Sequence, residues 1–299
     1  MIHPQSLKKG DKIAIVSPAA AIRNHSIIEG AIATLHSWGL ESVVAPHCLS
    51  RNGYYSGSKN ERLSDLLWAV SNDDIKAILC SYGGYGCIHL VEEFAKAIEK
   101  NPKWVIGMSD CSVLHAACNA KGIESLHAAQ CRMLATEPQG DATTNIQKIL
   151  FGNRPVYKTE PHYLDIEGHA KGIIAGGNLS VLSGLMRTRY DIFTPGKILF
   201  IEDINEPIYR IERILQNLKL AGILQSAQAL IVGEFTDTKE HSGFGGTLYE
   251  VIYNTVADCN IPVCFNFPVG HGKRNLPMIE GAEAVIDISK EKGTSLRFL

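Results

Sequence analysis

The chain of 299 residues lacks any apolar run long enough to cross a membrane, and it carries no excess of positive charge. Its first apolar run, IAIV, is far shorter than the hydrophobic segment of a secretory signal, and no later stretch approaches the length of a transmembrane helix. A formal net charge of -2 leaves no basic face for nucleic acid or anionic lipid. We therefore expect a cytoplasmic protein whose partner is neither a nucleic acid nor a membrane.

The cysteines are not arranged as a disulfide framework or a zinc site. All eight are scattered through apolar segments, and no two of them form a C-x-x-C pair. This usage indicates buried free thiols in a reducing compartment. Internal repeats and low-complexity tracts are absent as well, and the composition, 45% hydrophobic and 20% charged, is that of a globular protein.

The first 135 residues alternate short β-branched runs with longer amphipathic stretches. This alternation, from KIAIV to IESLHA, predicts parallel strands covered by helices on both faces, an α/β sheet of the flavodoxin or Rossmann type. Ligands of such sheets bind where the carboxyl ends of the strands meet the connecting loops. The Gly and Ser clusters after the third and fourth apolar runs therefore lie where a site is expected.

The rest of the chain predicts a linker and a second domain. Residues 136–167 contain three prolines and little apolar periodicity, so we interpret them as the crossing between an N-terminal domain, residues 1–135, and a C-terminal domain, residues 168–299. Three strand-like segments close the chain without intervening helices. This pattern favours a smaller, β-rich domain with a mixed or barrel-like sheet.

The stretch WVIGMSDCSVLH, residues 104–115, places Ser109 between an apolar run and a helical pattern. Gly107 allows a sharp bend, and the start of the helix offers free N–H groups and the positive end of its dipole to a nucleophile. The alternative is that Ser109 or Asp110 only caps the helix, because both residue types are preferred caps. The G-x-S-x-G motif of α/β-hydrolases is absent, since Cys111 replaces its last glycine.

A second turn, CSYGGYGCIHL, places Gly83, Gly84 and Gly86 between an apolar run and a helical segment. Glycines at such a turn let backbone N–H groups point inward and approach an anion or a developing oxyanion. The stretch is not a P-loop, because no Lys-Ser/Thr pair follows, and its spacing differs from the dinucleotide-binding fingerprint. A tight turn without a binding role is the alternative.

Two further residues are suited to activate a serine. Glu202 directly follows four apolar residues and continues their strand. A carboxylate at such a position is unfavourable unless it has a hydrogen-bonding or charged partner or a catalytic role. His271 lies between two glycines in a loop, whereas a structural histidine usually sits on a patterned element. A serine hydroxyl needs a base, and the base needs a carboxylate to fix its tautomer. Ser109, Glu202 and His271 are therefore candidates for one catalytic triad, although spacing alone does not show that they converge.

These motifs together resemble the LD-carboxypeptidases, or muramoyltetrapeptide carboxypeptidases, a serine-peptidase family that includes the microcin C self-immunity peptidases. Seven segments carry the resemblance, in order and over nearly the whole chain: KKGDKIAIVSPA, SGSKNERLSDLLWAVSNDDIKAI, YGGYG, IGMSD, AGGNLSVL, LFIEDINEPIYRIERIL and GHGKRNLPMIEGAEAVID. The chain departs from the family at two points. Tyr82 stands where the family commonly has an arginine, and Ala128 stands where it often has a glycine.

The resemblance implies a role for each matching residue. Ser109 matches the family nucleophile, and Glu202 and His271 match the other members of its triad. The remaining implied site residues are the backbone N–H groups of the oxyanion hole, Asp110 and Gly84, and two candidates for substrate contact, Gly83 and Tyr85. The family also implies an N-terminal parallel α/β domain, a smaller C-terminal β-rich domain, a homodimer, and neither a metal nor a cofactor.

The implied reaction is hydrolysis of an L,D-amide bond in cytoplasmic muropeptide tetrapeptides, which releases the terminal D-alanine during peptidoglycan recycling. Three alternatives stay open: a microcin C immunity-type peptidase that cleaves aminoacyl-nucleotide conjugates, a non-catalytic ligand-binding α/β protein, and an esterase of the α/β-hydrolase type. The residue that binds the terminal carboxylate also stays open. The candidates are Arg132, Arg187, Arg189 and Arg274.

Overall fold

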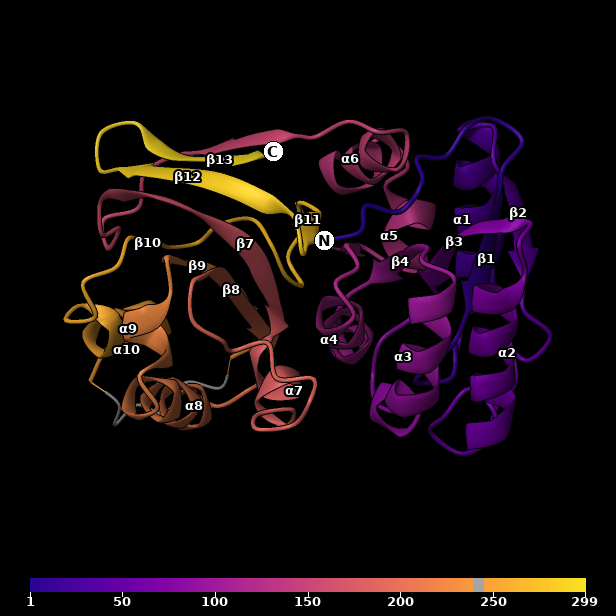
Figure 1. The fold of residues 1–299 in the computed structure, drawn as a ribbon, viewed down its shortest axis with the longest axis horizontal. Helices are drawn as coiled ribbons and strands as arrows, with labels where there is room; N and C mark the ends of the chain where they lie inside the picture. Colours follow the sequence, from indigo (N-terminus) through magenta and orange to yellow (C-terminus); the bar gives the residue numbers. More distant parts are fainter. Residues whose placement is uncertain (239–244) are drawn as a thin grey trace. The chain divides into compact units, whose positions relative to one another are not determined.

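The computed structural model describes residues 1–238 and 245–299, which form two compact units, each with its own sheet and helices (Figure 1). Unit 1 comprises Met1–Asn153 and Leu276–Gly281, and unit 2 comprises Arg154–Asn275 and Ala282–Leu299. No helix among the described residues is both long enough and apolar enough to cross a membrane. The chain is thus the two-part α/β protein that the sequence predicts.

Unit 1 is built on a six-stranded sheet in the order β11-β5-β4-β3-β1-β2. Neighbouring strands among β1 to β5 pair in parallel, and β11 pairs antiparallel with β5. The bounds are β1 Lys12–Val16, β2 Glu41–Val44, β3 Ile75–Cys80, β4 Trp104–Gly107, β5 Ser125–His127 and β11 Met278–Glu280. The central strands are buried almost throughout because helices cover both faces, which explains their continuous apolar runs.

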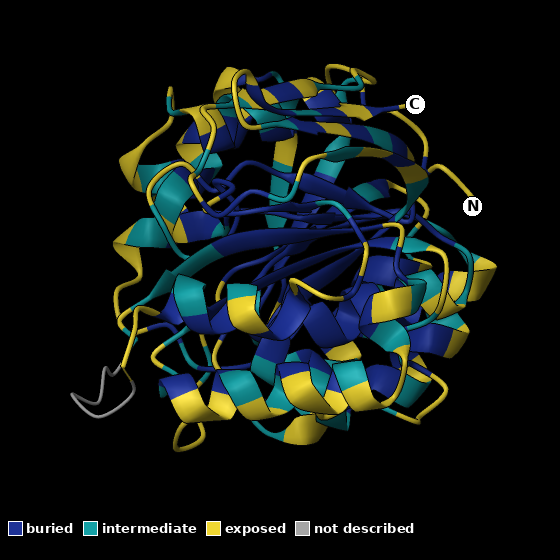
Figure 2. Ribbon diagram, turned by 90° about the vertical axis from the view of Figure 1, so that its left-hand side faces the viewer, coloured by how far each residue is buried: buried dark blue, intermediate teal, exposed yellow. Residues whose placement is uncertain are grey.

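Two layers of helices enclose this sheet. The helices α2, α3 and α4 pack side by side, and α1 packs against α5. The bounds are α1 Ser26–Ser37, α2 Lys59–Ser71, α3 Val91–Lys100, α4 Ser112–Ala120, α5 Cys131–Thr136 and α6 Asp141–Leu150. A capping box starts α2, because Ser58 Oγ accepts the N–H of Glu61 and the Glu61 carboxylate accepts the N–H of Ser58. In Figure 2, in which unit 2 faces the viewer, the central strands are mainly buried and the helices are exposed on their outer sides.

Unit 2 contains a seven-stranded sheet in the order β10-β9-β8-β7-β12-β13-β6. The pairs from β10 to β7 are parallel, and the remaining pairs are antiparallel. The strands are β6 Val156–Thr159, β7 Gly168–Asn178, β8 Lys197–Ile204, β9 Ala229–Thr236, β10 Val263–Cys264, β12 Glu283–Ser289 and β13 Gly293–Phe298. The helices are α7 Leu179–Ser183, α8 Ile208–Leu220, α9 Ile223–Ser226 and α10 Leu248–Val256. The expected mixed sheet is present, and in the described chain its edge strands β10 and β6 do not pair, so the sheet is open rather than a barrel.

The structure divides the chain differently from the boundaries expected from the sequence. The chain crosses between Asn153 and Arg154, inside the expected crossing of residues 136–167, but this segment also contains α6 in unit 1 and β6 in unit 2. The helix α6 forms because Ile146, Ile149 and Leu150 bury one face of it. The segment Leu276–Gly281 belongs to unit 1 rather than to the C-terminal domain, because β11 adds to the edge of the first sheet.

Candidate active site

Ser109 lies on a strained turn directly after β4. The strand ends at Gly107, and Ser109 has a φ of 62°, in the left-handed region that residues with a side chain rarely occupy. Space at Gly107 is tight, because a Cβ there would lie 3.0 Å from the Cys111 side chain and 3.1 Å from Cys80 Cβ. Ser109 itself is half-buried, whereas the residues on either side of it are buried. The turn therefore presents Ser109 at the carboxyl end of the sheet.

The helix after this turn does not use Ser109 as a cap. The chain continues through the 3₁₀ turn η2 (Ser109–Cys111) into α4, and in the described chain neither element has a side-chain hydrogen bond at its N-cap. The buried carboxylate of Asp110 instead accepts a hydrogen bond from the backbone N–H of Cys87 at 2.8 Å. Burial raises the pKa of Asp110 to about 6, against the lowering effect of that hydrogen bond. Asp110 thus joins the Ser109 turn to the end of the glycine turn.

The glycine turn after β3 packs directly against Ser109. A Cβ at Gly83 would lie 2.8 Å from Ser109 Cβ and 2.9 Å from Ser109 Oγ, so only glycine allows this approach. Gly84 has a φ of 104°, and within the described residues its N–H donates to no acceptor. Gly86 has a φ of 143°, and its carbonyl oxygen accepts a hydrogen bond from buried Arg62 at 3.1 Å. The Gly84 N–H is therefore available to a ligand of this turn.

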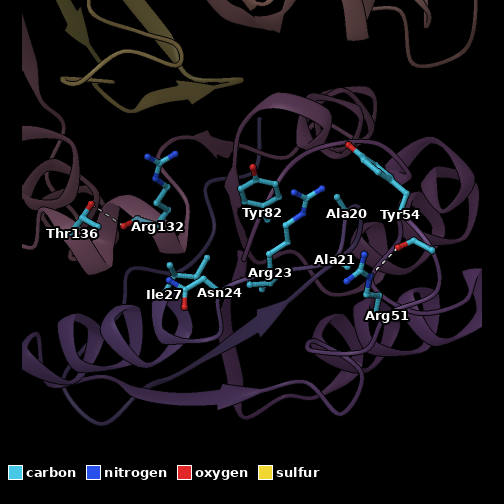
Figure 3. Close-up of a pocket in the computed structure, with 12 residues that line it drawn as sticks. Ala20, Ala21, Arg23, Asn24, Ile27, Arg51, Tyr54, Tyr82, Arg132 and Thr136 are labelled. Atoms are coloured by element: carbon cyan, nitrogen blue, oxygen red, sulfur yellow. Dashed lines mark hydrogen bonds between the residues drawn. The ribbon is translucent and has the colours of Figure 1, made fainter.

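The two tyrosines of the glycine turn lie in different surroundings. The Tyr85 ring, a candidate for substrate contact, packs 5.4 Å from the His89 ring and 6.2 Å from the Tyr55 ring. Tyr82, which precedes the glycine pair, lines a cavity of unit 1 (Figure 3). Tyr82 is thus part of a cavity wall, whereas Tyr85 is an exposed member of an aromatic cluster and stays a candidate for substrate contact.

Two consecutive carboxylates end β8 in unit 2, on alternate sides of the strand. Glu202 is 0% exposed and Asp203 is 2% exposed. Asp203 accepts hydrogen bonds from the N–H of Ser180 at 2.8 Å and from the side-chain amide of Asn178 at 2.9 Å, so it anchors the start of α7. Burial, together with the charge of Glu202, raises the pKa of Asp203 to about 6.

His271 pairs with Glu202, as the sequence proposes for a histidine oriented by a carboxylate. The distance from His271 Nδ1 to Glu202 Oε2 is 2.7 Å, and the imidazole is 17% exposed. Gly270 has a φ of 131°, and a Cβ there would lie 2.9 Å from Glu202 Cβ, so this flanking glycine permits both the loop and the close approach. Burial lowers the pKa of His271, but the charge of Glu202 and the hydrogen bond to it outweigh burial and raise that pKa above its ordinary value.

Two residues that support the histidine loop were not predicted from the sequence. The backbone N–H of Gly272 donates to the carboxylate of Glu234, and a Cβ at Gly272 would collide with that carboxylate. On the other side of His271, the Gly270 N–H donates to Asn275 Oδ1 at 3.1 Å. Glu234 carries the same signal as Glu202, an acidic residue that continues an apolar strand. Asn275 carries no comparable signal, because asparagine is ordinary in a loop.

Comparison with known proteins identifies the family. The LD-carboxypeptidase N-terminal domain matches residues 13–128, and the LD-carboxypeptidase C-terminal domain matches residues 171–286. A putative carboxypeptidase of Synechocystis sp. is 31% identical over 287 residues, which cover 96% of this chain and 94% of the relative. The chain belongs to the LD-carboxypeptidase family.

Two further similarities agree with this membership. A probable murein peptide carboxypeptidase of Bacillus subtilis is 30% identical, with 96% of this chain and 92% of the relative covered. The crystal structure of muramoyltetrapeptide carboxypeptidase from Oxalobacter formigenes matches with a TM-score of 0.87 and 25% identity, over 96% of this chain and 98% of that chain.

Both LD-carboxypeptidase domains carry part of the predicted triad. Ser109 lies within the segment that matches the N-terminal domain, and it belongs to unit 1. Glu202 and His271 lie within the segment that matches the C-terminal domain, and both belong to unit 2. Within unit 1 the Ser109 turn packs against the glycine turn, and within unit 2 Glu202 and His271 form a hydrogen-bonded pair.

The four candidate arginines for a terminal carboxylate are separated in the same way. Arg132, on α5 of unit 1, lines the same cavity as Tyr82. Arg187, Arg189 and Arg274 belong to unit 2, where the Arg189 guanidinium lies 5.9 Å from the centre of the Tyr190 ring. Burial raises the pKa of Glu234, and the charge of Arg274 opposes this rise only in part. Of these four candidates, Arg132 is therefore the one that belongs to the same unit as Ser109.

One buried cluster in unit 1 has the residue types of a metal site. The donor atoms of His115, His127 and Glu280 lie within 4.8 Å of one another. Both ring nitrogens of His115 already have partners, since Nδ1 lies 2.9 Å from Ser125 Oγ and Nε2 lies 2.9 Å from the carbonyl oxygen of Gly107. A metal would have to displace one of these contacts. Through His115 Nε2 and the Gly107 carbonyl, the cluster contacts the end of β4, directly before the turn that carries Ser109.

Proposed function

We propose that this protein is a serine LD-carboxypeptidase that releases the terminal D-alanine from murein tetrapeptides by cleaving an L,D-amide bond. The observation that carries the proposal is the 2.7 Å hydrogen bond between His271 Nδ1 and the buried Glu202. This bond holds the proton on Nδ1 and leaves Nε2 as a general base. The murein peptide carboxypeptidases among its relatives support the choice of substrate.

In this mechanism, His271 takes the proton of Ser109 Oγ while the oxygen attacks the scissile carbonyl. The N–H groups of Gly84 and Asp110 donate to the developing oxyanion. The imidazolium then gives its proton to the nitrogen of the leaving D-alanine, which leaves an acyl-enzyme on Ser109. A water molecule, deprotonated by His271, hydrolyses the ester and restores the serine. The mechanism requires Ser109 of unit 1 and His271 of unit 2 to meet in the substrate complex.

Replacement of Ser109 by Ala is the direct test. We expect Ser109→Ala to lower kcat for D-alanine release by roughly four or more orders of magnitude, because removing the nucleophile removes the acyl-enzyme route. The measurement is mass spectrometry of an L,D-tetrapeptide incubated with each protein. A fluorophosphonate probe should label the unmodified protein at Ser109 and should not label the variant.

The matched control is Ser112→Ala, which removes a serine hydroxyl three residues further on, in α4. This variant should keep both D-alanine release and labelling. Near-native tetrapeptide hydrolysis by Ser109→Ala would contradict the proposal. Cleavage of an aminoacyl-sulfamoyl nucleotide by the unmodified protein, with no cleavage of the tetrapeptide, would replace the proposed substrate by that of an immunity-type peptidase.

A further inference from the structure

Unit 1 contains a cavity of about 860 Å³ at the carboxyl ends of its parallel strands (Figure 3). Its walls come from the loops after β1, β2 and β3 and from α5. The polar and aromatic side chains that define it are those of Arg23, Arg51, Arg132, Tyr54 and Tyr82. This volume is within the range of about 300–1,000 Å³ that is usual for sites that enclose a small ligand.

The charge of this cavity is one-sided. Three lining residues are arginines from three separate segments, and none of the residues that line the cavity is an Asp or a Glu. Across the described part of the chain, no carboxylate lies within salt-bridge distance of Arg23, Arg51 or Arg132. Because the whole chain has a formal net charge of -2, this local concentration of positive charge does not reflect a generally basic surface. Arg51 Nε donates to the carbonyl oxygen of Gly53 at 3.3 Å, which leaves its terminal N–H groups, with the guanidinium groups of Arg23 and Arg132, for an anionic ligand.

The cavity also adjoins the nucleophile turn. Tyr82 lines the cavity and is followed by Gly83, whose Cα packs so closely on Ser109 that a Cβ would lie 2.9 Å from Ser109 Oγ. On Gly84, a Cβ would lie 2.8 Å from the hydroxyl of Tyr54, another residue of the cavity wall. The glycine pair therefore has Ser109 on one side and the arginine-lined cavity on the other.

We infer that this cavity binds the substrate peptide through two or more of its carboxylates, with Arg23, Arg51 and Arg132 as specificity-determining residues. Guanidinium groups bind carboxylates by paired, charge-assisted hydrogen bonds, so each added carboxylate on the peptide strengthens binding. This inference rests on the proposed function, because it assigns the cavity to the peptide that Ser109 cleaves. It predicts that the enzyme distinguishes peptides by their number of free carboxylates, beyond the terminal one.

The test compares two peptides that differ by a single carboxylate. One is L-Ala-γ-D-Glu-L-Lys-D-Ala, and the other has the D-Glu α-carboxylate replaced by a carboxamide. Binding is measured by titration calorimetry to the Ser109→Ala variant, which cannot turn the peptide over. We expect the acid to bind about 10-fold or more tightly than the amide, the usual scale of one charge-assisted hydrogen bond. A third peptide with diaminopimelate in place of lysine adds a carboxylate and should bind more tightly still.

Variants of the three arginines test which of these side chains bind the carboxylates of the peptide. Arg23→Gln, Arg51→Gln and Arg132→Gln, each in the Ser109→Ala background, should weaken binding of the most acidic peptide, at least two of them by about 10-fold or more. In at least one of these variants, the loss of affinity should be smaller for the amide peptide than for the acid peptide. The amide peptide already lacks the carboxylate that the replaced arginine would bind. Arg297→Gln, an exposed arginine on β13 of unit 2, is the matched control and should not change the affinity.

The outcomes separate this inference from the proposed function. If the unmodified protein releases D-alanine but the arginine variants bind all three peptides as tightly as their parent, the inference is overturned and the peptidase assignment stands. If D-alanine is not released and Ser109 is not labelled, the proposed function fails, while the calorimetry still reports whether the arginines bind carboxylates. Displacement by equimolar inorganic phosphate, with no difference between acid and amide, would show a general anion site and would also overturn the inference.

Discussion

The imidazole of His271 is subject to opposing effects. Burial disfavours the imidazolium, whereas the carboxylate of Glu202, bonded at 2.7 Å, favours it, and the net effect raises the pKa of His271. A base must be neutral at Nε2 to accept a proton from serine. The activity should therefore be lost as the pH falls through this raised pKa.

Glu202→Gln should change both the rate and its dependence on pH. Removing the negative charge removes the attraction for the imidazolium, so the pKa of His271 falls and the acidic limb of the kcat/KM profile moves to lower pH. The plateau should fall by about 10,000-fold, because the amide no longer fixes the productive tautomer. The measurement is kcat/KM for tetrapeptide hydrolysis from pH 5 to pH 9.

The matched control for this change is Glu234→Gln. The carboxylate of Glu234 accepts a hydrogen bond from the N–H of Gly272, next to His271. Glu234 is not among the groups that raise the pKa of His271. This variant should leave the acidic limb close to its original position. An unchanged limb in Glu202→Gln would contradict the assignment of Glu202 as the partner of the base.

The candidate triad residues stand out in the sequence because each carries a signal in its own segment. Glu202 continues an apolar strand, His271 sits between glycines, and Ser109 lies between an apolar run and a helical pattern; that Ser109 does not cap the helix is seen only in the structure. Arg23 and Arg51 carry none, because an arginine in a loop is ordinary. Their proposed role depends on three loops, from separate strands, that line one cavity, which neither periodicity nor spacing encodes.

Two turns of unit 1 act together through one carboxylate. Asp110 lies in η2 and accepts the N–H of Cys87 at the start of the 3₁₀ turn η1 (Cys87–His89), at 2.8 Å. The turn with the nucleophile is thereby tied to the turn with the proposed oxyanion donor Gly84. A shift of one turn against the other would misplace the serine relative to the N–H group.

Asp110→Ala should therefore impair both stability and activity. The buried Cys87 N–H loses its acceptor, which costs about 1–3 kcal/mol of unfolding free energy. Misplacement of the two turns should lower kcat by on the order of 100-fold, whereas Asp110→Asn, which keeps an acceptor oxygen, should be affected less. Urea unfolding and tetrapeptide hydrolysis measure the two effects.

Asp65→Ala provides a matched control for Asp110→Ala. Asp65 is 4% exposed, against 3% for Asp110, and accepts the backbone N–H of His47 at 2.9 Å. It should lose similar stability while kcat stays within a few-fold of the parent. An equal loss of kcat in both variants would show that Asp110 acts through stability alone.

At the level of elements, the parallel strands and their helices were predictable because buried strands and amphipathic helices differ in period. Of the elements that the sequence did not predict, β6 and β11 are short, whereas α6 spans Asp141–Leu150. The helix α6 and the strand β6 lie in a stretch with prolines. The strand β6 extends only over Val156–Thr159, which is too short for a clear alternation of apolar and polar residues. The small strand β11 pairs with β5, far from it in the chain, and no local pattern encodes that partner.

The chain is divided into two units that are interleaved rather than sequential. After building most of unit 2, it returns to unit 1 at Leu276–Gly281 and then closes the sheet of unit 2 with β12 and β13. The returning strand β11 is fully buried at Met278 and Ile279, and Ile279 pairs with Leu126 of β5. Removal of the C-terminal part of the chain would therefore also remove an edge of the first sheet.

Ile279→Ala should destabilise unit 1 selectively. Ile279 is 0% exposed, and truncation of such a side chain costs about 2–5 kcal/mol. Hydrogen exchange of the full chain should become faster in β5 and β4 and stay unchanged in β12 and β13, provided that the two units open independently. Ile2→Ala, at a residue 50% exposed, should change stability by less than about 0.5 kcal/mol. Equal acceleration of exchange in both sheets would instead show that β11 couples the two units into one unfolding transition.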